Sequence, residues 1–288
     1  MVAALVELVE GCVLMKPAPF DYHSATSLDD AVSVMFDRTN DARVIAGGQS
    51  LVPMLNMRLL SPKTLVDISG IESLATIESA GSYVEVGANV SQCDLLNWPE
   101  LQQRLPVLAK ALPFVGHVQT RNRGTVCGSI AHADPSSELP LCLAVLDGEV
   151  VLQSKKGRRT LNSDEYQWGM LTTARRSDEL ITAVRFPEHS QCGTAFKEIA
   201  RRHGDFANVA LAATADEARV RLGVGGVADR PEVREWGVDD LIDLDAELNE
   251  FAWQLKGYDD IHATARYRRE LVRRLGKQVI EEAISCRP

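Results

Sequence analysis

The stretch Arg43-Val-Ile-Ala-Gly-Gly-Gln-Ser50 decides how the fold begins, because it joins a short apolar run to two consecutive glycines. Arg43-Val-Ile45 predicts a buried strand, and the residues from Leu51 predict a helix with Pro53 in its first turn, where proline is tolerated. Glycine has no Cβ, so an anion can approach the bare N–H groups between the strand and the helix. The motif is typical of a phosphate-binding turn, although a plain strand-to-helix turn has the same pattern.

A second glycine-containing stretch lies about eighty residues further along and reads Thr125-Val-Cys-Gly-Ser-Ile-Ala-His-Ala-Asp-Pro-Ser-Ser-Glu138. Thr125 and Ser129 offer hydroxyls, and Gly128 allows close approach of a ligand. Asp134 and Glu138 offer acceptors for sugar or ribityl hydroxyls. Two such turns could clamp one pyrophosphate from both sides. Neither turn is G-x-G-x-x-G or a Walker A motif, which disfavours a Rossmann-type dinucleotide dehydrogenase.

The surrounding pattern of helix, strand, glycine turn, helix and strand predicts an α/β beginning. A capping box at Ser27-Leu-Asp-Asp30 predicts the first helix. Prolines interrupt residues 91–113 and predict several short helices there. Further predicted elements are strands at 64–68 and 83–87, a buried helix at 138–146, a hairpin around 149–160, and a strand at 180–186.

A boundary is predicted near residues 188–194. Beyond it, strand-like segments at 208–214 and 219–224 and helices at about 239–256 and 262–285 predict a three-stranded sheet backed by helices. We therefore predict an α+β fold with these parts: an extension at 1–14, a first domain at 15–190 with subdomains at about 15–70 and 71–190, and a C-terminal domain at 191–288.

Composition excludes several classes of protein. The formal net charge of -9 disfavours nucleic acid as a partner. The six cysteines form no C-x-x-C pair, which argues against a metal or iron–sulfur centre held by this chain and indicates a reducing, cytoplasmic location. The first ten residues lack a basic segment and are too short to span a bilayer, so we predict neither a secretory signal nor an association with a membrane. A basic cluster at 266–274 is interpreted as a solvated helix face or a subunit contact.

Together these segments resemble the FAD-binding medium subunit of the xanthine dehydrogenase / carbon monoxide dehydrogenase family, the molybdenum hydroxylases. The similarity covers about residues 15–286. The matching segments are Lys16–Phe20, Ala46–Pro53, Val66–Ile68, Arg121–Pro140, Glu179–Pro187, Lys197 and Arg202–Ala207. Within the family, the chain looks most like subunits of bacterial enzymes that oxidise N-heterocycles of the purine alkaloid or nicotine type.

The resemblance implies an FAD-binding fold of the p-cresol methylhydroxylase type in two subdomains, followed by a small α+β domain. It also implies a heterotrimer, in which a large subunit carries molybdopterin and a small subunit carries [2Fe–2S] clusters. Electrons would pass through FAD on this chain to an external acceptor, which could be NAD, oxygen, a quinone or a cytochrome. The implied cofactor contacts are Ala46, Gly47, Gly48, Gln49, Ser50, Leu51, Thr125, Cys127, Gly128, Ser129, Asp134, Glu138, Ile181 and Lys197, with Asp205 and Phe206 in a loop covering the flavin.

One position departs from the family pattern, since Cys127 stands where a glycine is usual. A left-handed backbone there would cost a cysteine about 1–2 kcal/mol, so we interpret position 127 as tolerant and Gly128 as the required glycine. His132 is interpreted as a residue that orders its loop. No nucleophile–base set or metal motif emerges, so no catalytic or metal-binding residue is predicted. A stand-alone FAD-dependent oxidase and a non-catalytic nucleotide-binding module remain alternatives.

Overall fold

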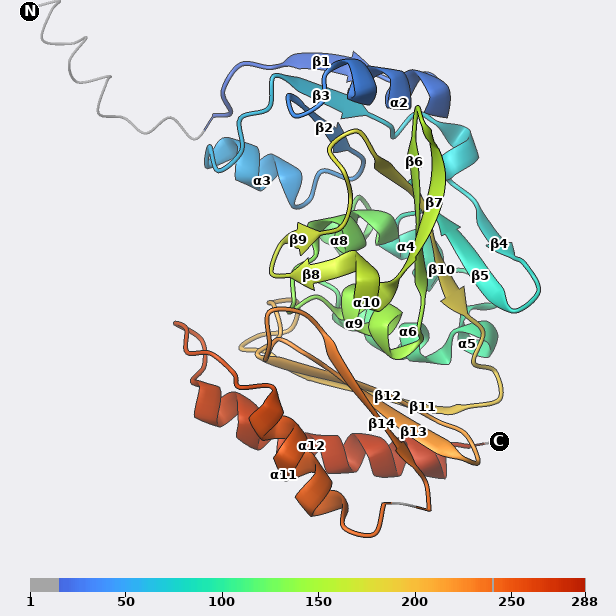
Figure 1. Ribbon diagram of the computed structural model, residues 1–288, viewed down its shortest axis with the longest axis vertical. Helices are drawn as coiled ribbons and strands as arrows, with labels where there is room; N and C mark the ends of the chain where they lie inside the picture. The colour runs from blue at the N-terminus through green and yellow to red at the C-terminus, as the bar shows by residue number, and fades with distance from the viewer. Residues whose placement is uncertain (1–15, 240, 288) are drawn as a thin grey trace, which may run out of the picture.

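The computed structural model describes residues 16–239 and 241–287. Figure 1 shows three sheets stacked along the long axis, from the N-terminal sheet at the top to the C-terminal sheet at the bottom. The predicted extension at residues 1–14 lies outside the described residues.

The N-terminal sheet is parallel and has the order β1-β3-β2, formed by Asp21–Ser24, Thr64–Asp67 and Ala42–Ile45. Helices α2 (Leu28–Asp37) and α3 (Leu51–Asn56) connect its strands. Ser27 caps α2 by accepting a hydrogen bond from the Asp30 N–H. The predicted α/β beginning is confirmed. Strand β1 was not predicted, because its Asp-Tyr-His-Ser sequence is a mostly exposed edge strand without an apolar pattern.

The central sheet is antiparallel with the order β4-β5-β10-β6-β7. Its strands are Ile77–Ser79, Tyr83–Gly87, Leu180–Pro187, Glu149–Ser154 and Gly157–Asn162. The associated helices are η1 (Glu72–Leu74), α4 (Gln92–Leu96), α5 (Leu101–Arg104), α6 (Pro106–Ala111), η2 (Leu112–Phe114), α7 (Val118–Arg121), α8 (Val126–His132), α9 (Glu138–Val145) and α10 (Ser163–Tyr166). A two-stranded ribbon, β8 (Gln167–Gly169) and β9 (Thr172–Thr173), follows α10. The short helices predicted from the prolines are confirmed.

The C-terminal sheet is antiparallel and has four strands rather than the three predicted. They are β11 (Gly193–Ile199), β12 (Val209–Ala215), β13 (Arg219–Gly225) and β14 (Glu232–Gly237). Strand β11 begins within the predicted boundary and β14 is a charged edge strand, so neither has a clear apolar alternation. Helices α11 (Leu244–Gln254) and α12 (Ala265–Ser285) complete the chain and start later than predicted.

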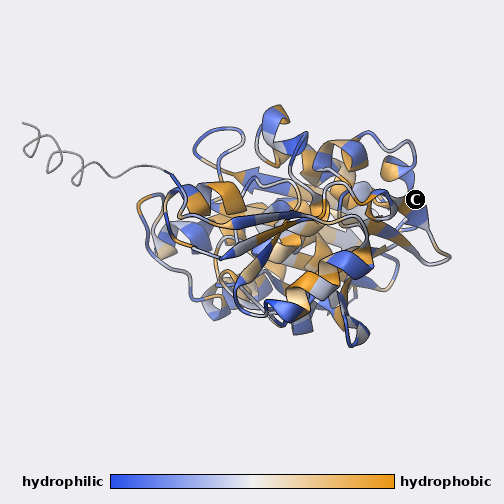
Figure 2. Cartoon of the chain, turned by 90° about the horizontal axis from the view of Figure 1, so that it is seen from above, coloured by the Kyte–Doolittle hydropathy of each residue, from blue (hydrophilic) through white to orange (hydrophobic). Residues whose placement is uncertain are grey.

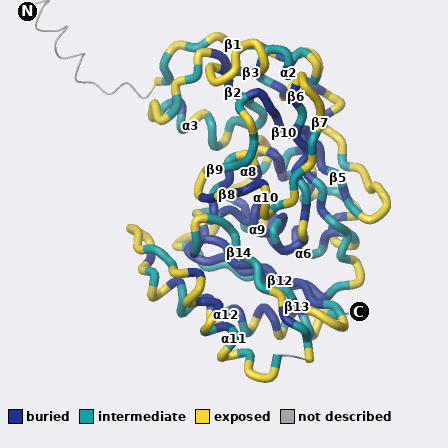
Figure 3. Tube along the Cα trace, viewed as in Figure 1, coloured by how far each residue is buried: buried dark blue, intermediate teal, exposed yellow. Residues whose placement is uncertain are grey.

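Strand β12 joins the two hydrophobic cores. Ala210 and Ala212 belong to the core that contains α8, α9 and the central sheet, whereas Leu211 and Ala213 belong to the core under α11 and α12. Neighbouring residues of a strand point to opposite faces, so the sheet is covered on both sides and every residue of β12 is buried. Figures 2 and 3 show the same arrangement, with apolar, buried residues inside and polar, exposed residues on the outer loops. This packing sets the C-terminal sheet against α9.

The basic cluster at 266–274 is only partly a solvated face. Arg268 is fully buried and donates hydrogen bonds to the carbonyl oxygens of Asn208 and Gly226 and to the Asp260 carboxylate, each at 2.6 Å. Arg273 and Arg274 pair with Glu270 on the surface of the same helix, as the prediction implied. The prediction is wrong for Arg268, because helical spacing alone cannot show which residue faces the β12–β13 sheet.

Candidate functional site

Both glycine turns line one cavity of about 610 Å³, within the range of cofactor sites. The first turn contributes all of Ala46–Leu51 to its wall. The second contributes Thr125, Cys127, Gly128 and Ser129, and Glu138 and Ile181 also line the cavity. The loop residues Asp205 and Phe206 also line the cavity, and the Phe206 side chain is largely exposed. Turns distant in sequence thus share one space large enough for a dinucleotide.

The first turn packs directly against the loop that leads into the second. A Cβ added at Gly47 would overlap the backbone carbonyl of Arg123 and would lie 2.8 Å from the Gly124 Cα. Gly124 is held in turn, because its carbonyl accepts a hydrogen bond from the Gln92 N–H. Position 47 therefore accepts no side chain without moving one loop away from the other.

The first turn presents a row of unused donors. Within the described residues, the backbone N–H groups of Gly47, Gly48, Gln49, Ser50 and Leu51 have no hydrogen-bond acceptor in the protein. Gly48 adopts a φ of +71°, a conformation that favours glycine, and Ser50 makes no capping bond with its side chain. Consecutive N–H groups at the start of a helix form an anion site, and this one fits the pyrophosphate of FAD.

The second turn is the start of helix α8. The Thr125 hydroxyl accepts a hydrogen bond from the Gly128 N–H at 2.9 Å and so caps the helix. A Cβ at Gly128 would lie 2.8 Å from that hydroxyl oxygen, which explains the glycine. Cys127 is helical and its φ is not positive, so the cysteine incurs no left-handed strain.

The Cys127 thiol is buried and lies 3.4 Å from the Val86 carbonyl oxygen, to which it donates. Burial raises the pKa of this thiol, and the same holds for Cys142. We expect iodoacetamide to alkylate Cys127 and Cys142 more than about tenfold more slowly than the exposed Cys286 in the native protein. Peptide mass spectrometry at timed intervals measures the three rates. Equal rates for Cys127 and Cys286 would contradict the described burial, and urea should make them equal.

Asp134 and Lys197, both predicted to contact the cofactor, do not line the cavity. The Asp134 carboxylate accepts a hydrogen bond from the Ser136 N–H at 2.8 Å. Lys197 donates to Gln278 at 3.0 Å and lies 3.8 Å from Glu282, both on α12. Strand alternation explains this direction, because Phe196 belongs to the core on the α9 side and its neighbour Lys197 faces α12.

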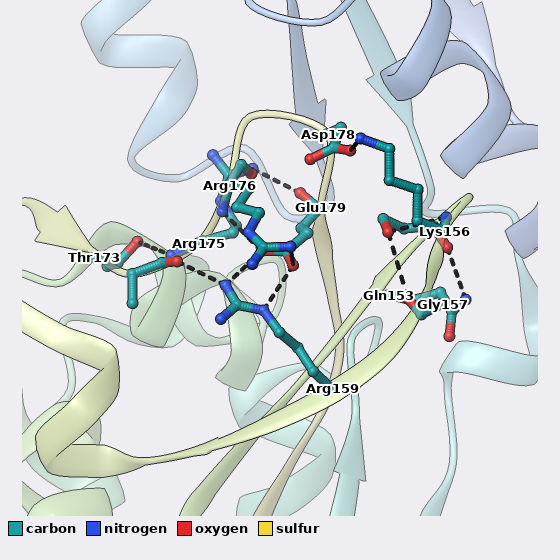
Figure 4. A network of polar contacts seen from close by, with 11 residues as sticks. Gln153, Lys156, Gly157, Arg159, Thr173, Arg175, Arg176, Asp178 and Glu179 are labelled. Carbon is teal, nitrogen blue, oxygen red and sulfur yellow. Dashed lines mark hydrogen bonds and ion pairs between the residues drawn. The ribbon is translucent and has the colours of Figure 1, made fainter.

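A charged network at one end of the cavity was not predicted from the sequence. Figure 4 shows Arg159, Arg175 and Arg176 gathered around Glu179. Arg159 binds both carboxylate oxygens of Glu179, at 2.7 and 2.9 Å, and the Arg176 N–H donates at 2.7 Å. Burial opposes ionisation, but these hydrogen bonds lower the pKa of Glu179 overall. Arg175 and Glu179 line the cavity and lie in the segment that leads into β10, whereas Arg159 reaches Glu179 from β7. No local motif could indicate this network, because residues 159 and 179 are far apart in the sequence.

His132 and Glu138 also line the cavity. Burial lowers the pKa of His132, which favours a neutral imidazole there. Burial also raises the pKa of Glu138 to about 7. Burial and the neighbouring Glu138 raise the pKa of Glu198, on β11, to about 8. Glu138 in the cavity wall and its neighbour Glu198 therefore form a carboxyl pair that favours the protonated state near neutral pH.

This carboxyl pair predicts how stability depends on pH. Both folded-state pKa values lie above those of an unfolded chain, so the folded protein retains protons that the unfolded chain has lost. The free energy of unfolding should therefore fall as pH rises from about 5 to 8. The slope of this fall should be smaller in Glu198→Gln, by up to ~1.4 kcal/mol per pH unit, because that variant lacks one of the two carboxyls. Urea unfolding of both proteins across this range measures the difference. Identical slopes would mean that folding does not raise the pKa of Glu198.

Two general features of the described residues bear on the class of protein. No group of three or more His, Cys, Asp or Glu side chains among them is arranged to hold a metal ion. In residues 16–239 and 241–287, every helix is too short or too polar to cross a bilayer.

Comparison with known proteins places the chain in a family. Residues 18–189 match the family described as the FAD binding domain in molybdopterin dehydrogenase. The chain is 37% identical over 282 residues to the nicotine 6-hydroxylase medium subunit of Paenarthrobacter nicotinovorans, covering 93% of this chain and 99% of that protein. It is 38% identical over 200 residues to the caffeine dehydrogenase subunit beta of a Pseudomonas species, covering 69% of this chain and 68% of the relative.

Among solved structures, a chain of carbon monoxide dehydrogenase from Hydrogenophaga pseudoflava superimposes with a TM-score of 0.88 and 28% sequence identity. The match covers 94% of this chain and 99% of that one. The mixed helix-and-sheet fold and the resemblance inferred from the motifs are therefore confirmed. This chain belongs to the FAD-binding medium subunits of the molybdopterin dehydrogenases, and it is a subunit of an oxidoreductase.

Proposed function

We propose that this chain is the electron-transfer subunit of a heterotrimeric, cytoplasmic molybdenum hydroxylase. It would receive electrons from the [2Fe–2S] clusters of a small partner subunit and pass them to an external acceptor. A large partner subunit with molybdopterin would hydroxylate the substrate. The observation that carries the proposal is the meeting of Gly47 with the Arg123–Gly124 loop at one cavity, because this gives FAD a single site made by both turns.

FAD, when bound, supplies a centre that exchanges electrons one or two at a time. The chain's own residues bind and orient it. The N–H groups of the first turn and the Thr125–Ser129 turn would hold the pyrophosphate, and Glu138 would bond the ribityl or phosphate side. Ile181 would lie near the isoalloxazine, and the Asp205–Phe206 loop would cover it while leaving a path for electrons. Lys197 faces α12, so its proposed flavin contact would need a different side-chain direction.

The proposed substrate class is a small N-heterocycle. Nicotine and caffeine appear in the names of two relatives, and a chain of quinoline 2-oxidoreductase from Pseudomonas putida 86 superimposes with a TM-score of 0.84 and 31% identity. All three named compounds are N-heterocycles. The substrate would bind the large subunit, so no residue of this chain is proposed to contact it.

The test is to co-express the chain with candidate genes for a small [2Fe–2S] subunit and a large molybdopterin subunit. We expect a complex that contains FAD, iron and molybdenum and oxidises an N-heterocycle with an artificial electron acceptor. The chain alone should bind FAD and show no turnover. Turnover by the chain without molybdenum would instead support a stand-alone oxidase, and a colourless chain would support a module that does not use flavin.

A further inference from the structure

Arg175 lines the cavity and carries a charge that no carboxylate offsets. It lies between β9 and β10, and Figure 4 shows it next to Glu179. Its Nη1 atom donates hydrogen bonds to the main-chain carbonyl oxygens of Arg176 and Glu179, at 3.0 and 2.6 Å, which fixes the direction of the side chain. Among the described residues, its Nε and Nη2 atoms have no hydrogen-bond acceptor and Arg175 forms no ion pair. Arg175 is therefore a fixed cation at the cavity.

The carboxylate of Glu179 is occupied by other donors. Arg159 binds both of its oxygens, at 2.7 and 2.9 Å, and the Arg176 N–H donates to it at 2.7 Å. Arg175 reaches only the main-chain carbonyl of Glu179. Burial of an arginine without a counter-ion disfavours its charged form, and burial lowers the pKa of Arg175. The network therefore leaves Arg175 as a surplus positive charge.

Arg43, on β2, is a second guanidinium on the cavity wall without a counter-ion. Its Nη1 atom donates to the carbonyl of the preceding residue at 3.0 Å, and within the described ranges it forms no ion pair. Other carboxyls of the wall do not offset the two arginines. Burial raises the pKa of Glu138 to about 7, and Asp205 pairs with Arg202 at 3.2 Å. An anionic ligand would therefore complement Arg43 and Arg175.

We propose that Arg175 and Arg43 are the counter-ions for the diphosphate of FAD, in addition to the N–H groups of the first turn. A guanidinium fork matches phosphate oxygens and stays charged at every pH at which the protein is folded. Neither arginine has to break an ion pair to bind the anion. They reach the ligand from different elements, Arg43 from the strand that leads into the first turn and Arg175 from the segment before β10. The inference rests on the proposed FAD site and adds the groups that recognise its charge.

The Kd for FAD tests the two arginines. FAD is titrated into the full chain, freed of flavin, and binding is followed by the change in flavin fluorescence. We expect Arg175→Met and Arg43→Met each to raise the Kd about 10- to 100-fold, because each removes a contact to a charged group. Arg175→Lys keeps the charge and should recover part of the loss, since an ammonium lacks the planar fork. Arg43→Met keeps the test decisive if Arg175→Met folds poorly, because the Arg43 side chain donates only to the residue before it.

Arg176→Met is the matched control, because residue 176 is the next in the chain, its side chain is 67% exposed and it does not line the cavity. Its Kd should stay within about twofold of the unmodified chain, as is usual for a surface change. The inference is overturned if both Arg175→Met and Arg43→Met bind FAD as tightly as the unmodified chain. It is also overturned if Arg176→Met loses as much affinity as they do, or if Arg175→Lys loses as much as Arg175→Met. Failure of the unmodified chain to bind FAD would instead overturn the cofactor site itself.

Discussion

Gly47→Ala is expected to reduce the FAD content of the purified chain to below about one tenth of the stoichiometric amount. The new methyl group would overlap the Arg123 carbonyl oxygen, and this oxygen belongs to backbone that cannot rotate away. The two loops would have to separate, which moves the N–H groups of Gly47–Leu51 away from the second turn. A misplacement of about 1 Å can remove most of the benefit of a preorganised site. Flavin absorbance relative to protein concentration measures the result.

Gly70→Ala is the matched control, because a Cβ at Gly70 would have no heavy atom within 4 Å. Its FAD content should equal that of the unmodified chain. Gly48→Val and Gly128→Val should also lose FAD, the first because Gly48 has a positive φ and the second because its side chain would collide with the Thr125 hydroxyl. Stoichiometric FAD in Gly47→Ala would refute the idea that the contact between the loops forms the site.

Arg268→Met is expected to lower the free energy of unfolding by about 3–5 kcal/mol. The substitution keeps much of the apolar stem but leaves the Asn208 and Gly226 carbonyls and the Asp260 carboxylate without their donor. Polar groups that lose a buried partner bear their full desolvation cost. Urea unfolding followed by circular dichroism measures the change.

Arg266→Met provides the control, since residue 266 lies on the same helix and is exposed. It should change the unfolding free energy by less than about 0.5 kcal/mol, as is usual at the surface. Arg268→Lys should recover only part of the loss, because an ammonium cannot reproduce the planar fork that reaches three acceptors. If Arg268→Met were as stable as Arg266→Met, the hydrogen bonds of Arg268 to Asn208, Gly226 and Asp260 would contribute nothing to the free energy of unfolding.

Much of the fold, and the two glycine turns of the site, could be predicted from local sequence patterns. The strand Ala42–Ile45, the glycine turn and the helix from Leu51 follow one another in sequence, so their backbone preferences and apolar pattern are local properties. The prolines at 106 and 113 act on their own residues in the same way. The C-terminal sheet was predicted with three strands instead of four because two of its strands lack a clear apolar alternation. Strand β14 is a charged edge strand, and β11 carries Lys197 and Glu198.

The sequence by itself determined the two glycine turns, the α/β beginning and the family, because these depend on residue types at fixed local spacing. Only the tertiary structure decided that Gly47 abuts Arg123, that Glu198 rather than Lys197 faces α9, and that Arg268 is buried among its exposed neighbours. Each of these depends on which face of an element meets a segment far away in the chain. Such contacts follow from the packing of segments that are distant in the sequence, and no short sequence window contains that information.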